Sequence, residues 1–104
     1  MNIKLKKAED FFKLGNALRD RGKLNDAVKN YKKAIELNPN YSIAYNDLGV
    51  LFINLGKTNE AINNFRKTIN ISPKNTKAYL NLSYSMTFSN KSSEIKKMEE
   101  IIIE

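Results

Sequence analysis

The feature that most constrains the fold is a 34-residue stretch that occurs twice. The first copy covers residues 8–41, the second covers residues 42–75, and ten of the 34 aligned positions are identical. The identical pairs include two glycines and one proline per copy: Gly15/Gly49, Gly22/Gly56 and Pro39/Pro73. Self-similarity at this period is typical of repeat architectures, in which each unit is one supersecondary element. The sequence therefore predicts a stack of similar units rather than a single enzyme core.

Apolar residues recur three and four positions apart in each copy, and this spacing predicts two helices per unit. We expect the breaks at Gly22 and Gly56, where glycine ends a helix, and at Pro39 and Pro73. The expected helices cover residues 3–21, about 25–37, 42–54, 58–71 and 76–88, with a sixth running from Ser92 or Ser93 to the end. Short connections make successive helices antiparallel hairpins. The predicted fold class is all-α, with hairpins that must stack because none can bury its apolar side alone.

Small residues are expected to set the distance between the helices of a hairpin. We expect Gly15 and Gly49 on the first helices to lie against Ala27 and Ala61 on the second, so that the backbones approach closely. Larger side chains would fill the volume around these contacts, namely Phe11, Leu14, Tyr31, Tyr45, Leu48 and Phe65.

These positions resemble the tetratricopeptide repeat (TPR). The first unit supplies Phe11, Leu14, Gly15, Leu18, Ala27, Tyr31, Ala34 and Pro39. The second supplies Tyr45, Leu48, Gly49, Phe52, Ala61, Phe65, Thr68 and Pro73, with Thr68 at an alanine position of the family. The third begins with Tyr79, Leu82 and Met86, but Ser83 replaces glycine and the second helix loses the pattern.

The resemblance implies a single TPR domain over residues 1–104. It would comprise repeat 1 (8–41), repeat 2 (42–75) and a degenerate third repeat or capping pair (76–104), stacked as a right-handed superhelix. The implied function is a protein–protein interaction module, whose concave groove holds a peptide or a partner's helix. Helix geometry places nine residues in that groove: Phe12, Asn16, Arg19, Asn46, Asp47, Val50, Lys77, Asn81 and Tyr84.

An apolar strip is expected in this groove, formed by Phe12, Val50, Tyr84 and Phe88, because exposed apolar residues rimmed by polar ones mark interaction sites. The alternative for Phe12 and Phe88 is packing between neighbouring helices. Some family members bind a C-terminal carboxylate through a clamp of lysines and asparagines. Asn16 and Lys77 match that clamp, but Phe12, Asp47 and Asn81 do not, so this mode is disfavoured.

The C-terminal residues 86–104, called the tail below, suggest two alternative functions. Residues 86–99 resemble the helix that follows the last repeat in bacterial proteins where TPR units precede a sulfotransferase domain. The chain would then be an N-terminal accessory segment of a larger transferase, of sulfotransferase or glycosyltransferase type. Residues 101–103 are three isoleucines, apolar all around a helix. They would pack on a downstream domain, cap the stack, or join a second copy, which makes a self-associating scaffold or homodimer the other alternative.

Composition argues against most enzyme chemistry. The chain has no cysteine and no histidine, which excludes disulfides, zinc fingers and imidazole catalysis. Every glycine occupies a repeat position, so no phosphate-binding loop remains. We expect no catalytic, metal or cofactor site and no enzyme activity. The chain starts without a signal-peptide pattern and contains no apolar run of about 20 residues, so a cytoplasmic location without membrane contact is expected.

The net charge of +7 raises the question of a nucleic-acid partner. Basic residues on the second helices of the units would contact the nucleic acid, namely Lys29, Lys32, Lys33, Arg66 and Lys67. No aromatic side chains alternate with them for stacking on bases, and lysines are also what solvated helix faces need. A protein partner is therefore preferred.

Overall fold

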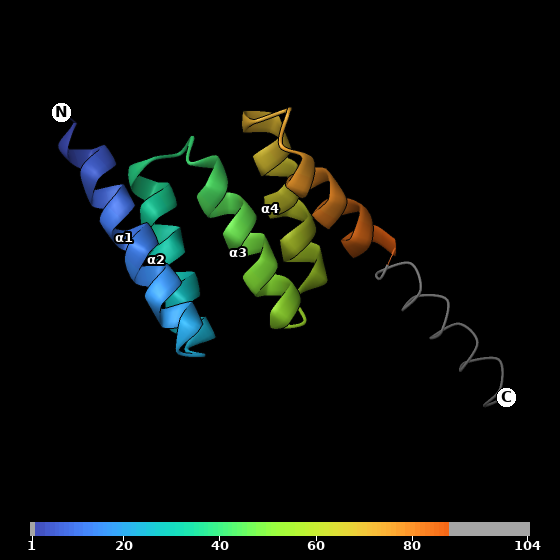
Figure 1. Ribbon diagram of the computed structural model, residues 1–104, viewed down its shortest axis with the longest axis horizontal. Coiled ribbons are helices and arrows are strands. Elements are labelled where there is room, and N and C mark those ends of the chain that lie inside the picture. The colour runs from blue at the N-terminus through green and yellow to red at the C-terminus, as the bar shows by residue number, and fades with distance from the viewer. Residues whose placement is uncertain (1, 88–104) are drawn as a thin grey trace, which may run out of the picture.

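The computed structural model describes residues 2–87, and these residues form helices joined by short turns (Figure 1). The elements are α1 (Ile3–Asp20), α2 (Leu24–Leu37), α3 (Ser42–Asn54) and α4 (Thr58–Ile71). Residues 76–87 are also helical and are called the 76–87 helix. The predicted all-α stack of hairpins is confirmed. The predicted sixth helix, Phe88 and most of the tail resemblance lie outside the described residues.

One glycine follows the first helix of each hairpin, Gly22 after α1 and Gly56 after α3. Gly22 and Gly56 have φ angles of +77° and +76°, a conformation that glycine adopts without a Cβ clash. The backbone then closes each helix in the same way, because Lys23 N donates to Leu18 O at 2.9 Å and Lys57 N donates to Phe52 O at 2.7 Å. The repeated turn explains why both hairpins have the same shape.

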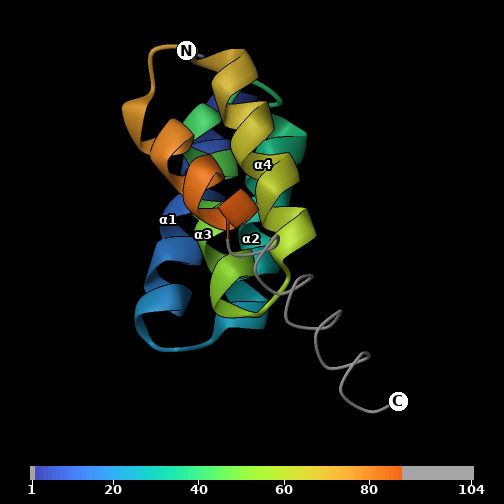
Figure 2. The same ribbon diagram turned by 90° about the vertical axis from the view of Figure 1, so that its right-hand side faces the viewer.

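The hairpins stack in the order of the sequence. Helix α1 packs on α2, α3 packs on α4, and α2 packs on α3. Figure 2 shows α1, α3 and the 76–87 helix on one side of the stack, with α2 and α4 on the other. The first helices of successive units therefore share one surface of the molecule.

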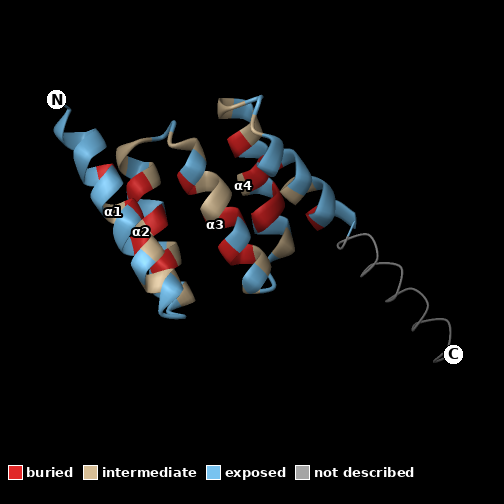
Figure 3. Cartoon of the chain, in the orientation of Figure 1, coloured by how far each residue is buried: buried red, intermediate tan, exposed pale blue. Residues whose placement is uncertain are grey.

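Every described helix contributes buried residues, which are red in Figure 3. The members of the core are mostly the repeat residues: Phe12, Ala27, Tyr31, Ala34, Ala44, Leu48, Leu51, Phe52, Ala61 and Phe65. Leu14 was expected among them, and that expectation is wrong, since Leu14 is 48% exposed. Its counterpart Leu48 is only 3% exposed, because α2 covers that side of α3.

The glycines inside α1 and α3 make room for aromatic rings of the facing helices. A Cβ atom on Gly15 would lie 2.6 Å from Cδ1 of Tyr31, and one on Gly49 would lie 2.5 Å from Cε1 of Phe65. Both distances are far shorter than a van der Waals contact. A close approach of the two helices was expected at these glycines, and a ring of the second helix occupies the space that a side chain at each glycine would need.

Candidate binding groove

The predicted groove residues come from the three helices that share one side of the stack (Figure 2). Helix α1 supplies Phe12, Asn16 and Arg19, α3 supplies Asn46, Asp47 and Val50, and the 76–87 helix supplies Lys77, Asn81 and Tyr84. Two polar contacts join neighbouring helices across this surface. Arg19 Nη1 lies 4.0 Å from Asp47 Oδ2, and Asn81 Nδ2 donates to Asn46 Oδ1 at 3.3 Å.

A polar cluster links α1 to α2 beneath this surface. The Tyr31 hydroxyl donates to Asn16 Oδ1 and accepts from Arg19 Nη1 at 3.3 Å. Burial raises the pKa of Tyr31 to about 12, so the phenol stays protonated and able to donate at neutral pH. Sequence reasoning treated Tyr31 only as a core residue. The signal for its polar role was the hydroxyl itself, since the equivalent residue in the second unit is Phe65.

Asp47 is the acidic residue at the centre of the surface. Its side chain is only 23% exposed. Burial raises the pKa of its carboxyl group, while the Arg19 guanidinium and the Asn46 amide oppose that rise. Asp47 and Arg19 therefore form a partly desolvated pair that bridges α1 and α3.

An apolar pocket of about 140 Å³ lies beside the amide pair. Its lining residues are Val50, Ile53, Phe65, Asn81, Tyr84 and Ser85. Val50 is 37% exposed and Tyr84 is 65% exposed, so both present apolar surface to solvent. Sites for small molecules usually measure about 300–1,000 Å³. The pocket is therefore of a size for a single side chain rather than for a cofactor.

Three other residues of these helices differ in their burial. Phe12 is 9% exposed, and its ring centroid lies 5.4 Å from that of Tyr31 and 5.1 Å from that of Tyr41. It packs between helices, which corrects its expected place in the apolar strip. Lys77 is exposed at the start of the 76–87 helix. Ser85 is fully buried and donates to Asn81 O at 2.8 Å, so its hydroxyl faces its own helix.

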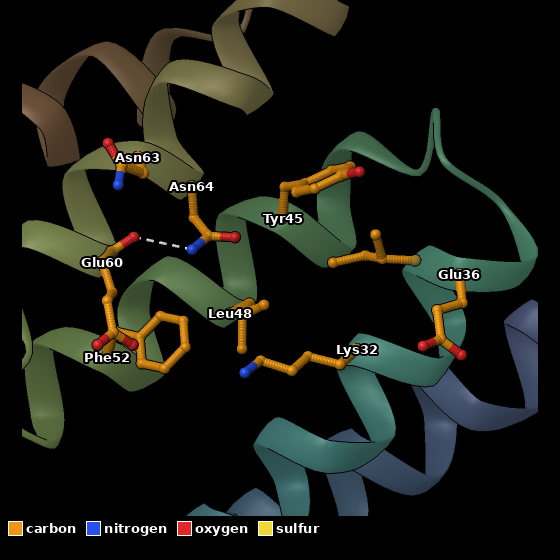
Figure 4. A pocket seen from close by; sticks show the side chains of 9 residues that line it. Lys32, Glu36, Tyr45, Leu48, Phe52, Glu60, Asn63 and Asn64 are labelled. Atoms are coloured by element: carbon orange, nitrogen blue, oxygen red, sulfur yellow. Dashed lines mark hydrogen bonds between the residues drawn. The ribbon is translucent and has the colours of Figure 1, made fainter.

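A second depression, of about 420 Å³, lies at the seam between the two hairpins. It is lined by Lys32, Ile35, Glu36, Tyr45, Leu48, Phe52, Glu60, Asn63 and Asn64. Figure 4 shows Lys32 reaching from α2 toward Leu48 and Phe52 of α3. Its Nζ atom lies 5.7 Å from the centroid of the Phe52 ring. The sequence did not predict this depression, which exists only because two hairpins meet.

Residues 2–87 contain no group of side chains suited to hold a metal ion. Over the same part of the chain, no helix has both the length and the apolar character needed to cross a membrane.

Comparison with known families gives two matches. A TPR repeat model matches residues 15–56, and a tetratricopeptide repeat model matches residues 43–75. Together they cover residues 15–75, which is more than half of the chain. None of the curated proteins matches the chain.

Several solved structures are similar to the whole fold. A crystal structure of MamA is 30% identical, with a TM-score of 0.80, and the match covers 88% of this chain and 53% of that one. The Arabidopsis OM64 TPR domain is 27% identical, with a TM-score of 0.80, over 88% of this chain and 75% of that one. The second TPR of Spaghetti (RPAP3), bound to an HSP90 peptide, is 21% identical, with a TM-score of 0.78, over 93% of this chain and 90% of that one. The chain spans about half the length of the MamA structures.

Proposed function

Because the chain belongs to the tetratricopeptide repeat family, we propose that it is a protein-interaction module whose groove binds a peptide or helix of a partner protein. The observation that carries the proposal is the exposed apolar pair Val50 and Tyr84 at the rim of one pocket. Apolar surface bordered by polar groups is typical of an interaction site. The amide pair Asn46 and Asn81 lies on the same two helices and offers donors and acceptors for a peptide backbone.

The partner would be anchored by an apolar side chain rather than by a terminal carboxylate. The pocket beside Val50 and Tyr84 is mostly apolar in its lining, which favours an aliphatic or aromatic anchor. Asp47 would repel a carboxylate, and Arg19 lies near it as its counter-ion. The HSP90 peptide in the Spaghetti (RPAP3) structure supports the general class of ligand only.

The test uses peptides selected from a displayed library on the full chain, with affinities measured by fluorescence anisotropy. We expect Val50→Ala combined with Tyr84→Ala to weaken binding by about tenfold or more, because both side chains lose apolar contact area with the peptide. Helical content should stay unchanged, since both residues are exposed.

Leu14→Ala is the matched control, since Leu14 is an exposed apolar residue that does not line this pocket. The control should bind the selected peptides as the wild type does. Equal affinity of the double variant and the wild type for every selected peptide would contradict the groove as the binding site. Loss of helical circular dichroism in the double variant would mean that these residues support the fold.

The remaining alternatives stay predictions. Sequencing the coding region beyond residue 104 would test the accessory role in a transferase. Nucleic-acid binding would require affinity to fall steeply with salt concentration. Against it, Lys32, Lys33 and Lys67 lie over the rings of Phe52, Phe11 and Tyr45, which gives these lysines a role in packing. The cytoplasmic location and the lack of enzyme activity also stay predictions.

A further inference from the structure

The outer side of α1, which is the side facing away from the rest of the stack, is an apolar face. No helix among residues 2–87 covers it. Leu14 is 48% exposed there, whereas the equivalent Leu48 is 3% exposed inside the stack. The face is hollowed into a depression of about 520 Å³. Its lining residues are Lys7, Asp10, Phe11, Leu14 and Leu37. Apolar surface of this kind indicates a docking surface.

The junction inside the stack indicates what fits this face. There α2 packs on α3, and residues of the two helices line one depression (Figure 4). Ile35 and Glu36 of α2 border it with Tyr45 and Leu48 of α3. By the 34-residue period, Phe11 and Leu14 of α1 are the equivalents of Tyr45 and Leu48. The outer side of α1 is therefore shaped for an antiparallel helix with an isoleucine and a glutamate at the positions of Ile35 and Glu36.

The chain contains a second segment with these two residues at these positions. Two periods after Ile35 and Glu36 come Ile103 and Glu104. Asn90 and Lys91 stand where Gly56 and Lys57 form the second turn, so the register of that turn is kept although the helix after it loses most of the repeat pattern. Asparagine is among the few residues other than glycine that visit a positive φ routinely. The sequence thus predicts a helix over residues 92–104 in the position of α2 and α4; this segment lies outside the described residues.

Charge complementarity favours the same pairing. The beginning of α1 carries Lys4, Lys6 and Lys7, and the end of the 92–104 segment carries Glu99, Glu100 and Glu104. An antiparallel arrangement would place the acidic end of the segment beside the basic end of α1. The positive N-terminal end of the α1 dipole would also meet the negative C-terminal end of the docked helix. Both effects favour this orientation over the parallel one.

We propose that the outer face of α1 binds residues 92–104 of a second copy of the chain, so that the stack of hairpins continues from one molecule to the next. Helix α1 and the 76–87 helix lie at opposite ends of the stack, so the segment comes from another molecule (Figure 1). Such a head-to-tail contact produces open chains of copies, or a ring where the rotation between copies closes. This contact leaves the groove surface free and does not depend on the proposed peptide binding.

The test compares two full-length variants by sedimentation velocity over a wide concentration range. Leu14→Glu removes the docking face but keeps the tail, and Ile103→Glu removes the tail contact but keeps the face. The wild type should form species that grow beyond a dimer with concentration. Each variant alone should be monomeric, with association weakened at least about tenfold because a carboxylate would be buried without a partner. An equal mixture of the two should form a one-to-one dimer, because it retains one intact face and one intact tail.

Leu80→Glu is the matched control, since it makes the same change at a leucine that is 66% exposed on the 76–87 helix. It should associate as the wild type does, and circular dichroism should show that all variants stay helical. A wild type that is monomeric at every concentration overturns the proposal. Self-association of either variant alone also overturns it. If Ile103→Glu associates, the contact joins two α1 faces, and if Leu14→Glu associates, the contact joins two tails.

A charge exchange tests the orientation. Lys7→Glu and Glu104→Lys should each weaken association at low salt. A mixture of the two variants should recover it, because the unchanged Glu104 of one meets the unchanged Lys7 of the other, and the two substituted residues form the same pair with opposite signs. Failure of the mixture to recover would overturn the antiparallel arrangement.

Discussion

Asp47 is a charged residue whose partial burial lowers the stability of the folded protein. The carboxyl group is partly buried between α1 and α3, and burial raises its pKa despite the nearby Arg19 guanidinium. A raised pKa means that the folded state holds the proton more tightly than the unfolded state. Stability should therefore fall as pH rises from the ordinary value of 3.8 through the higher pKa of the folded state.

Asp47→Asn should consequently raise the free energy of unfolding at neutral pH, because the amide carries no charge to desolvate. The difference between the variant and the wild type should shrink as the pH falls below the ordinary Asp value, where Asp47 is protonated in both states. Urea unfolding at a series of pH values measures this. Asp10→Asn is the control, since it removes the same charge from an exposed side chain of α1. A pH profile for Asp47→Asn that matches the wild type would show that Arg19 fully compensates the burial.

Thr68 is the residue at which the second unit departs from the repeat pattern. It is fully buried where the first unit has Ala34, which is also fully buried. Its Oγ1 donates to Asn64 O at 2.9 Å, one turn earlier in α4. A buried hydroxyl is tolerated when it is hydrogen-bonded in this way. The departure therefore leaves the packing of the hairpin intact.

At the scale of elements, the approach of two helices is set by a glycine and a ring. Gly15 faces Tyr31, and Gly49 faces Phe65. The third unit has Ser83 at the glycine position and, by the period, Glu99 at the ring position. Glycine and ring are thus lost together, which is the pattern expected if the ring is what requires the glycine.

Gly49→Ala should lower the free energy of unfolding by up to about 2 kcal/mol. The overlap of the added Cβ with a ring that is only 1% exposed should cost about 1–3 kcal/mol. The gain of about 1 kcal/mol that alanine brings to a helix interior offsets part of that cost. Ser83→Ala is the matched control at the equivalent position, where the side chain is exposed, and it should be neutral or slightly stabilising. Urea unfolding measures both. Equal stability of Gly49→Ala and the wild type would mean that the Phe65 ring moves aside freely.

Contacts between lysines and rings also repeat from hairpin to hairpin. Lys33 Nζ lies 5.3 Å from the centroid of the Phe11 ring, and Lys67 Nζ lies 5.9 Å from that of Tyr45. Each pair joins the second helix of a unit to its first helix, at positions 34 residues apart. A cation over an aromatic face is attracted by the ring, by about 0.5–1 kcal/mol at an exposed site. Part of the basic character of the chain therefore serves the packing within hairpins.

At the scale of the whole molecule, α3 has more buried residues than α1, α2 or α4. It packs on α4 within its hairpin and on α2 of the preceding one, and it contributes Ala44, Leu48, Leu51 and Phe52 to the core. Helix α1 packs on α2 and exposes Ile3, Leu5 and Leu14. In stacked repeats, stability is a sum of units and their interfaces, so an end unit opens more readily than an inner one.

Amide hydrogen exchange should therefore be slowest in α3 and fastest among these helices in the first two turns of α1. The physical reason is that opening α3 exposes five buried residues, more than in α1, α2 or α4, whereas fraying of the first turns of α1 exposes few buried contacts. Exchange followed by mass spectrometry at low protein concentration measures this. Leu14→Glu should leave the ranking unchanged under these conditions. Protection in early α1 equal to that in α3 would contradict this order of stability.

The sequence by itself determined the elements and their order. Gly22 and Gly56 locate the turns, Pro39 and Pro73 follow the ends of the second helices, and α3 and α4 have the predicted bounds. These predictions succeed because turns, helix ends and helical periodicity depend on residues close together in the chain. The 34-residue period added the architecture, since units that share one pattern bury it by stacking.

Only the tertiary structure decided which side of each helix is covered. Phe12 was expected either in the groove or between neighbouring helices and lies in the core against Tyr41, while Leu14 was expected in the core and is half exposed. Both stand on α1, two residues apart, and the periodicity of the sequence cannot separate them. Periodicity tells which residues share a helix face, but burial depends on whether another helix lies against that face. That neighbour comes from a distant part of the chain, or, as proposed for α1, from another molecule.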